Sequence, residues 1–359
     1  MSEYILSQIR PSDRRASKQM DALLQQEGIE RDKNLDYSVG LFDEDYNLAA
    51  TGSCFSNTLR CLAVSSDHQG EGLLNQVLSH LMEYQYSRGN TSLFLYTKCG
   101  TAKFFGDLGF YEIARVEGKV VFMENRRTGF ADYLKKLQTE TSQSPAAKAV
   151  SLLANPRTGA VVMNANPFTL GHRWLVEYAA SKVDLLHVFI VSEDVSLVPL
   201  SVREQLVREG TADLGNLVYH QTGPYVISNA TFPSYFLKDK DTVIRSHARL
   251  DIQVFQKIAG ALNISQRFVG EEPFSQVTGI YNQVMKEELE AAGISCTIIP
   301  RREDTDGPIS ASGVRELLRD GNWDDLQKKV PESTFRYFTS EKAASVLQKL
   351  READEVRHY

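Results

Sequence analysis

In the first third of the chain, short apolar runs typical of strands are followed by apolar residues spaced as in a helix. Runs at residues 38–41, 48–54 and 57–64 predict three strands. Apolar residues at helical spacing predict a helix over residues 73–87, followed by a strand over 92–97 and a short helix to residue 108. This mixture predicts an α+β domain.

The second half alternates regularly between strands and helices. Strands are predicted at residues 160–163, 185–191, 217–219, 267–269 and 295–299, and helices at about 171–182, 201–212, 250–262 and 281–291. The run at 185–191 is almost entirely apolar, as in a strand covered on both faces. The alternation predicts a Rossmann-like parallel sheet, whose ligands bind at the carboxyl ends of the strands.

The two halves are joined by a segment of different composition. Residues 139–148 are mostly small and polar and show no apolar period, which predicts a linker. A chain of 359 residues is long enough for two domains. We therefore expect one domain over residues 1–140, a linker over 141–157 and a second domain over 158–359.

Composition and charge exclude several classes of protein. With 42% apolar and 24% charged residues, the chain is neither disordered nor fibrous. A net charge of −6 provides no general attraction to nucleic acid or to anionic membranes. The four cysteines lack metal-ligand spacing, and no metal site is predicted. Without a signal peptide or a long apolar segment, we expect a cytoplasmic protein.

The first chemical motif covers residues 163–172, Met-Asn-Ala-Asn-Pro-Phe-Thr-Leu-Gly-His. It leaves the first strand of the second half and opens the following helix. A helix N-terminus presents free N–H groups that suit a phosphate. Gly171 allows close approach of the backbone, and His172 can direct a ring N–H to the same place.

The second motif, Ile-Ser-Ala-Ser-Gly-Val-Arg at residues 309–315, precedes a predicted helix over 314–319. Ser310 or Ser312 can cap that helix, and either hydroxyl can hold an anion beside the exposed N–H groups. Arg315 adds a positive charge one turn into the helix. Two helix starts suited to phosphate on one sheet predict a ligand with several phosphates.

These motifs resemble known signatures. Thr-x-Gly-His at 169–172 resembles the (His/Thr)-x-Gly-His signature of the nucleotidyltransferase superfamily, and Ile-Ser-x-Ser-x-x-Arg at 309–315 resembles its distal phosphate loop. Longer strings at residues 162–169, 210–213, 230–233, 267–274 and 309–312 resemble the citrate lyase ligase family over nearly the whole chain. That family carries an acetyltransferase-like domain in front of the nucleotidyltransferase-like one.

The resemblance implies an AMP-forming acid–thiol ligase that activates citrate lyase. ATP, acetate and the thiol of the acyl carrier subunit, which bears a dephospho-CoA-type prosthetic group, would give an acetyl thioester, AMP and diphosphate through an acetyl-adenylate, with Mg²⁺. His172 and Thr169 would be catalytic donors to the α-phosphate, and Ser310, Ser312 and Arg315 would hold the β and γ phosphates. The other nucleotide contacts would come from Asn164, Asn166, Phe168, Gly171, Gly270, Glu271, Ile309 and Arg203. Arg203 is equally compatible with a salt bridge on its own helix.

One position departs from the pattern of the family. The residue corresponding to Gly313 tends to be basic there, so the distal phosphate loop of this chain has one charge fewer.

The first half carries a second resemblance. Gln69-Gly70-Glu71-Gly72 starts the helix after the third strand, and with residues 104–110 it resembles the Gcn5-related N-acetyltransferase fold. Asp67 and Phe105 replace the basic or amide residue and the tyrosine acid usual in that superfamily, which argues against transfer from acetyl-CoA. Gln69, Gly70 and Gly72 are predicted to hold the CoA-like arm of the carrier. The alternative is a domain retained for stability.

Two further hypotheses remain open. A plain nucleotidyltransferase would use the same motifs to adenylylate a phosphorylated small molecule and would need no thiol. An N-acetyltransferase with an ATP-sensing second half would depend on the first half and not on His172.

Overall fold

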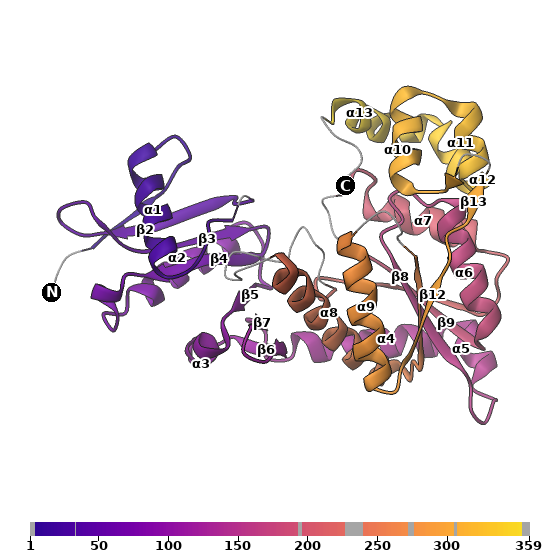
Figure 1. The fold of residues 1–359 in the computed structure, drawn as a ribbon, viewed down its shortest axis with the longest axis horizontal. Helices are drawn as coiled ribbons and strands as arrows, with labels where there is room; N and C mark the ends of the chain where they lie inside the picture. Colours follow the sequence, from indigo (N-terminus) through magenta and orange to yellow (C-terminus); the bar gives the residue numbers. More distant parts are fainter. Residues whose placement is uncertain are drawn as a thin grey trace. The chain divides into compact units, whose positions relative to one another are not determined.

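The computed structural model describes residues 4–32, 34–192, 196–226, 240–271, 276–304 and 307–353, and these form two compact units. The first contains the described residues up to Asp132 together with 240–253, and the second contains those from Tyr133 to 226 and from Val254 onward (Figure 1). The strings 230–233 and 272–274 lie outside the described residues. The predicted domain boundaries remain predictions.

The first unit is built on a seven-stranded sheet of order β1-β2-β3-β4-β5-β7-β6. Its strands are β1 (Ile5–Gln8), β2 (Tyr37–Phe42), β3 (Leu48–Phe55), β4 (Thr58–Val64), β5 (Phe94–Thr97), β6 (Tyr111–Val116) and β7 (Val120–Glu124). Its helices include α1 (Arg14–Gln26), α2 (Leu73–Ser87) and α3 (Ala102–Asp107). Only β4 and β5 pair in parallel. Val77, Leu78 and Leu81 of α2 are buried in one core with residues of β2 to β5.

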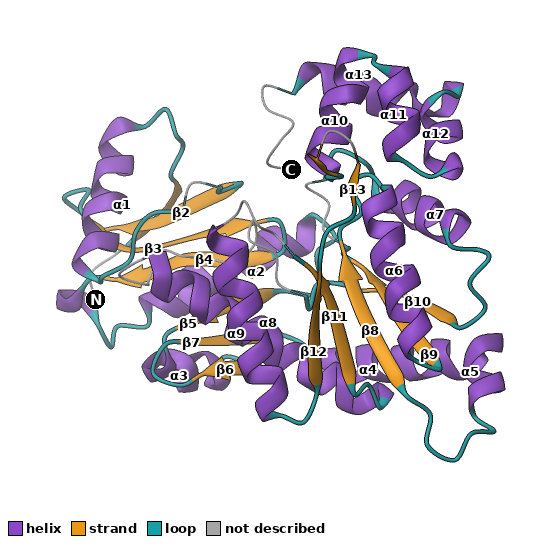
Figure 2. Ribbon diagram, turned by 45° about the vertical axis from the view of Figure 1, so that its right-hand side comes forward, coloured by secondary structure: helices purple, strands orange, loops and turns teal. Residues whose placement is uncertain are grey.

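The second unit contains a five-stranded parallel sheet of order β10-β9-β8-β11-β12 (Figure 2). Its strands are β8 (Thr158–Met163), β9 (Leu185–Ile190), β10 (Leu217–Gln221), β11 (Gln266–Gly270) and β12 (Ser295–Ile299). The order reverses between β8 and β11, which are neighbours, and such a switch point is where parallel sheets bind ligands. The predicted fold class, an α+β domain followed by a Rossmann-like parallel sheet, is confirmed.

Helices cover both faces of this sheet. Leu186 of β9 shares a core with Val176 of α6 (Leu170–Lys182), whereas Leu185 shares another with Ala146 of α5 (Pro145–Val150). Successive strand residues point to opposite faces, so α6 and α5 pack on opposite sides. The other helices are α4 (Gly129–Gln143), α7 (Leu200–Gly210), α8 (Lys240–Leu262), α9 (Gln276–Ala291), α10 (Ala311–Asp320), α11 (Trp323–Lys329), α12 (Glu332–Phe338) and α13 (Ala344–Glu352), of which α4 and α8 have residues in both units. Among the helices described here, none has the length and apolar character needed to span a membrane.

The segment predicted as a linker is largely helical. Helix α4 runs from Gly129 to Gln143, and α5 follows directly. Tyr133 and Leu137 are buried, and one turn later the same stripe continues with Glu140, whose carboxylate lies 2.8 Å from Nδ1 of the buried His220. A charged residue therefore occupies the position at which an apolar one would have revealed the helix.

Candidate active site

Two loops meet at the carboxyl edge of the parallel sheet. One follows β8 and leads into α6, and the other leads into α10. A Cβ atom at Gly171, in the first turn of α6, would lie 2.9 Å from the carbonyl oxygen of Ile309. The first turn of α6 therefore contacts the backbone just before α10. The two helix starts predicted to suit phosphate are brought together.

His172 is held in one orientation by the start of its own helix. Thr169 is the N-cap of α6, and its Oγ1 accepts the backbone N–H of His172 at 3.3 Å. The backbone N–H of Thr169 donates to Nδ1 of His172 at 3.1 Å, and the Thr169 hydroxyl lies 2.9 Å from the same nitrogen. An N–H can only donate, so Nδ1 is the unprotonated acceptor. The proton of the neutral ring is on Nε2.

The electrostatic surroundings keep this imidazole neutral. Burial, together with the positive charges of Arg301 and Arg315, lowers the pKa of His172 to about 4. At neutral pH the ring therefore offers a hydrogen bond from Nε2 without adding a charge. Thr169, which was predicted to donate to the ligand directly, is itself buried and bonded to His172.

Phe168 lies in the core and not at the mouth of the loop. Its ring is fully buried and stacks on the His172 ring at a centroid distance of 6.0 Å. A Cβ at Gly210 would approach the Phe168 ring to 2.6 Å, so glycine at 210 makes room for it. The buried ring is not accessible for the predicted nucleotide contact. It packs instead against the ring of His172 on the side of the core.

Arg203 is fully buried at the ends of two strands. Its Nη1 donates to the carbonyl oxygens of Asn164 and Val191 at 2.8 and 2.7 Å, and its Nε donates to the carbonyl of Val198 at 2.9 Å. Nη1 also lies 2.9 Å from Oδ1 of Asn164. Of the two roles considered for Arg203, contact with phosphate or an ion pair on its helix, these bonds show neither. They fix the first loop against the sheet.

Asn166 links the two loops and retains one unused donor. Its carbonyl oxygen accepts Nη1 of Arg315 at 2.6 Å, and its Oδ1 accepts the backbone N–H of Val198 at 3.0 Å. That second bond identifies the other side-chain atom as Nδ2, which is buried without a hydrogen-bond partner among the described residues. Burial lowers the pKa of Arg315 to about 10. Arg315 is 3% exposed and bonds to the first loop, so it lies between the two loops and not at the surface.

The second loop presents its hydroxyls at the start of α10. Ser310 is the N-cap, and its Oγ accepts the backbone N–H of Gly313 at 3.1 Å. The Ser312 hydroxyl lies 3.1 Å from that of Ser310, and both residues are partly exposed. Ile309, in contrast, is buried. Among the described residues of this loop, the two serines and the N–H groups of the first turn are the polar groups available to a ligand.

The neighbouring strand ends contribute one residue that the sequence analysis missed. Gly270 ends β11, and the exposed Glu271 follows it, as predicted. Arg301, just after β12, donates from Nε to the carbonyl of Glu271 at 2.8 Å. The carbonyl of Arg302 accepts the backbone N–H of Ile309 at 3.1 Å, which ties this segment to the second loop. Arg301 belongs to no motif, and its place two residues after the predicted strand 295–299 was the only signal for it.

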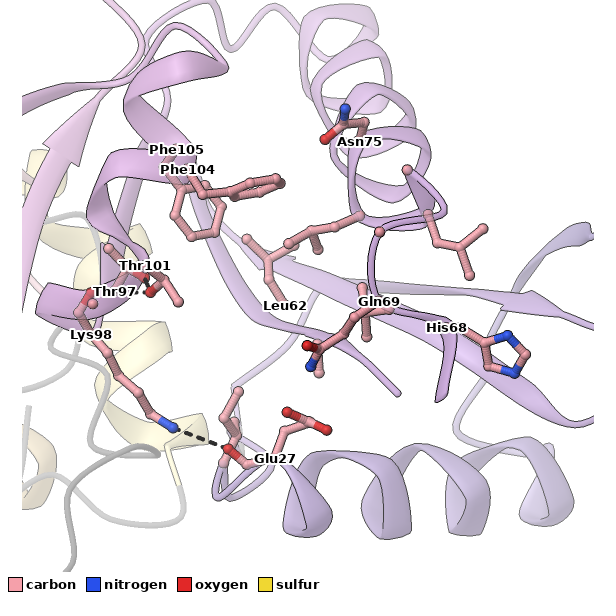
Figure 3. Close-up of a pocket in the computed structure, with 18 of the residues that line it drawn as sticks. Glu27, Leu62, His68, Gln69, Asn75, Thr97, Lys98, Thr101, Phe104 and Phe105 are labelled. Atoms are coloured by element: carbon pink, nitrogen blue, oxygen red, sulfur yellow. Dashed lines mark hydrogen bonds between the residues drawn. The ribbon is translucent and has the colours of Figure 1, made fainter. Parts of the chain in front are cut away.

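The first unit has a cavity of its own, of about 590 Å³. The β4–β5 pairing is limited to Thr58 with Phe94 and Leu59 with Leu95, and the later residues of both strands line the cavity. Gly70 and Gly72 have φ angles of 90° and 75°, which favour glycine, and Gly72 is the N-cap of α2. Figure 3 shows side chains around this cavity, among them Leu62, Gln69, Asn75, Thr97, Thr101, Phe104 and Phe105.

No group of three or more His, Cys, Asp or Glu side chains within the described ranges is arranged as a metal site.

Comparison with known proteins identifies a matching family model and a similar protein of named function. The family model described as the citrate lyase ligase C-terminal domain matches residues 158–338. The citrate (pro-3S)-lyase ligase of Klebsiella pneumoniae is 38% identical over 330 residues, which cover 90% of this chain and 93% of that protein.

Two solved structures are similar to parts of the chain. An acetyltransferase of the GNAT family from Staphylococcus aureus is 12% identical, with a TM-score of 0.30 over 34% of this chain and 98% of that one. Thermotoga maritima TmcAL, bound with alpha-thio ATP, is 16% identical, with a TM-score of 0.35 over 52% of this chain and 56% of that one.

Proposed function

The chain belongs to the citrate lyase ligase family and is a ligase, and from this premise we propose that it acetylates the prosthetic-group thiol of the citrate lyase acyl carrier subunit. ATP and acetate are the other substrates, and AMP and diphosphate are released. The observation that carries the proposal is the contact of Gly171 with Ile309, because it joins two helix N-termini around a neutral His172. Such a site suits a triphosphate.

In the first step an acetate oxygen attacks the α-phosphorus of ATP. The bond from that phosphorus to the diphosphate breaks, and acetyl-adenylate and diphosphate result. His172 donates from Nε2 to an α-phosphate oxygen, where negative charge increases in the transition state. In the second step the carrier sulfur attacks the acetyl carbon, AMP leaves, and the thiol proton passes to solvent.

The other residues divide into those that bind and those that position. Ser310, Ser312 and the first N–H groups of α10 bind the β and γ phosphates. Gly270 and Glu271 lie beside the adenosine, at the end of the strand next to β8. Thr169 positions His172 by fixing its tautomer, and Arg203 positions the first loop through carbonyl groups. Asn166 directs its unused Nδ2 donor to the substrate.

Mg²⁺ is assigned no protein ligands, since the described residues contain no acidic or histidine cluster for it. Magnesium is commonly held by substrate phosphates with water. When bound, it would neutralise charge on the β and γ phosphates.

The cavity of the first unit is proposed to take the CoA-like arm of the carrier. Its walls are largely apolar, and the N–H groups at the start of α2 can face a phosphate of the arm. Phe105 lines the cavity and cannot supply a proton, which fits binding without acetyl transfer. The full-length variant Leu62→Trp, which narrows the cavity, should raise the KM for the carrier.

Two controls make that test decisive. Leu62→Trp should leave acetyl hydroxamate formation from ATP, acetate and hydroxylamine unchanged, since this reaction needs no carrier. Leu152→Trp, at a side chain that is 87% exposed, should change neither reaction. An unchanged carrier KM in Leu62→Trp would assign the cavity a structural role only.

The proposed function is tested by restoring deacetylated citrate lyase. The chain is incubated with it, ATP, Mg²⁺ and labelled acetate, and citrate cleavage and label on the carrier are measured. Both should appear with the wild type and be largely lost in His172→Ala. Adenylylation of a phosphorylated small molecule without any thiol would favour a plain nucleotidyltransferase. Acetylation of amines that survives in His172→Ala would favour an N-acetyltransferase.

A further inference from the structure

We propose that Arg301 binds the triphosphate of ATP and supplies the fixed positive charge next to His172. The proposal rests on the ATP site proposed above and adds to it a residue that neither motif contains. Position 313 of the second loop was expected to be basic but is glycine. The proposal names Arg301 as the residue that provides a positive charge for the phosphates instead.

The backbone places Arg301 at the carboxyl edge of the sheet, after β12 and beside β11. Its Nε donates to the carbonyl of Glu271, after β11, while the N–H of Glu271 donates to the carbonyl of Ile299 at the end of β12, each at 2.8 Å. The guanidinium is thus anchored across two strand ends. Strand β11 pairs directly with β8, which leads to the first loop.

Two contacts connect this segment to the turn that carries His172. The N–H of Ile309 donates to the carbonyl of Arg302, and the carbonyl of Ile309 lies 2.9 Å from the Cβ position of Gly171. Arg301 and His172 therefore converge on the same edge from different strands. The positive charge of Arg301 disfavours protonation of the His172 imidazole, and it lowers the pKa of His172 more than the charge of Arg315 does.

Neither His172 nor Arg315 offers an accessible positive charge to the phosphates of ATP, whereas Arg301 does. A neutral His172 donates a hydrogen bond but brings no positive charge to a polyanion. Arg315 is charged, but its residue is only 3% exposed and Nη1 donates to the carbonyl of Asn166. Arg301 is partly exposed, so a solute can reach it. A guanidinium is well suited to phosphate because its N–H groups donate in a planar fork.

The test compares Arg301→Ala with Arg302→Ala, the neighbouring residue whose side chain is exposed and which bonds to Ile309 through its backbone carbonyl. Binding of ATP and of adenosine to the full chain is measured by calorimetry. Arg301→Ala should weaken ATP binding at least tenfold and adenosine binding less than twofold. Arg302→Ala should leave both within twofold, and Arg301→Lys should recover part of the loss. The dependence of ATP affinity on salt should be shallower in Arg301→Ala alone.

Several results would overturn the proposal. These are unchanged ATP affinity in Arg301→Ala, an equal loss for ATP and adenosine, and an equal effect of the two alanine variants. The measurement contains no acetate and no carrier. A chain that binds ATP through Arg301 but releases no diphosphate with acetate would refute the proposed function and leave this inference standing.

Discussion

The contact between Gly171 and Ile309 can be tested by adding a single methyl group. The Cβ of Gly171→Ala would lie 2.9 Å from a backbone oxygen, whereas ordinary van der Waals contacts begin near 3.4 Å. The two helix starts would therefore have to separate by about 0.5 Å. Because a displacement of about 1 Å in a reacting geometry can cost about 100-fold in rate, half of it should cost about tenfold.

Gly171→Ala should not show the gain in unfolding free energy that is usual when alanine replaces a glycine in a helix. Replacing glycine by alanine inside a helix ordinarily stabilises by about 0.5–1 kcal/mol. Overpacking against a rigid backbone costs about 1–3 kcal/mol. Gly171→Ala should therefore be neutral or destabilised by up to about 2.5 kcal/mol once these opposing effects combine.

Gly260→Ala is the matched control, since it adds the same methyl group to helix α8 at a position where the new Cβ would meet no described atom within 4 Å beyond its chain neighbours and the backbone of its own helix. It should be stabilised slightly and remain fully active. The free energy of unfolding in urea and kcat/KM for ATP in acetate-dependent diphosphate release are measured for both variants. If Gly171→Ala were as stable and as active as Gly260→Ala, the two loops would not be in contact. That result would contradict the site described here.

Three further predictions concern polar side chains of the second unit. His172→Ala should lower kcat by about 10²–10³, because one donor to the developing charge is lost, and it should also lower the urea midpoint slightly, because the backbone N–H of Thr169 loses its acceptor; a loss of kcat below tenfold in steady-state kinetics would contradict the catalytic role. Arg203→Leu should cost about 3 kcal/mol or more in unfolding free energy by leaving three carbonyl groups without their donor, and an unchanged urea midpoint would argue against it. Burial lowers the pKa of His187 to about 3, so protonation favours the unfolded chain and stability falls as the pH drops below about 6.5. Between pH 7.5 and 5 the wild type should lose about 2 kcal/mol more than His187→Phe, and parallel losses would exclude His187 as the cause.

The sequence predicted the parallel sheet well because its strands are apolar and regularly spaced between helices. It also located both loops of the site, since helix starts and glycines are local features. Helix α1 was missed, although Ala16, Met20, Leu23 and Leu24 follow a helical spacing behind the N-cap Asp13. That stripe was predictable from the same rule that identified α2.

Other features depend on contacts between distant residues and had no local signal. Glu140 completes a helical stripe only because His220, far along the chain, is its partner. Arg203 donates to three carbonyls that its own helix does not provide, so its role required the fold. The same holds for Arg301, whose position follows from the neighbouring strand β11 and not from any motif.

The central claim is that acetate attacks the α-phosphorus of ATP, and the fate of the acetate oxygen tests it most directly. The wild-type chain is given ATP, Mg²⁺ and acetate labelled with ¹⁸O in both oxygens, with hydroxylamine to trap the acetyl group. The AMP formed is then analysed by mass spectrometry. The account predicts one ¹⁸O atom in each AMP, with acetyl hydroxamate in equal amount. Unlabelled AMP, or ADP in its place, would contradict an acetyl-adenylate and with it the mechanism proposed for this site.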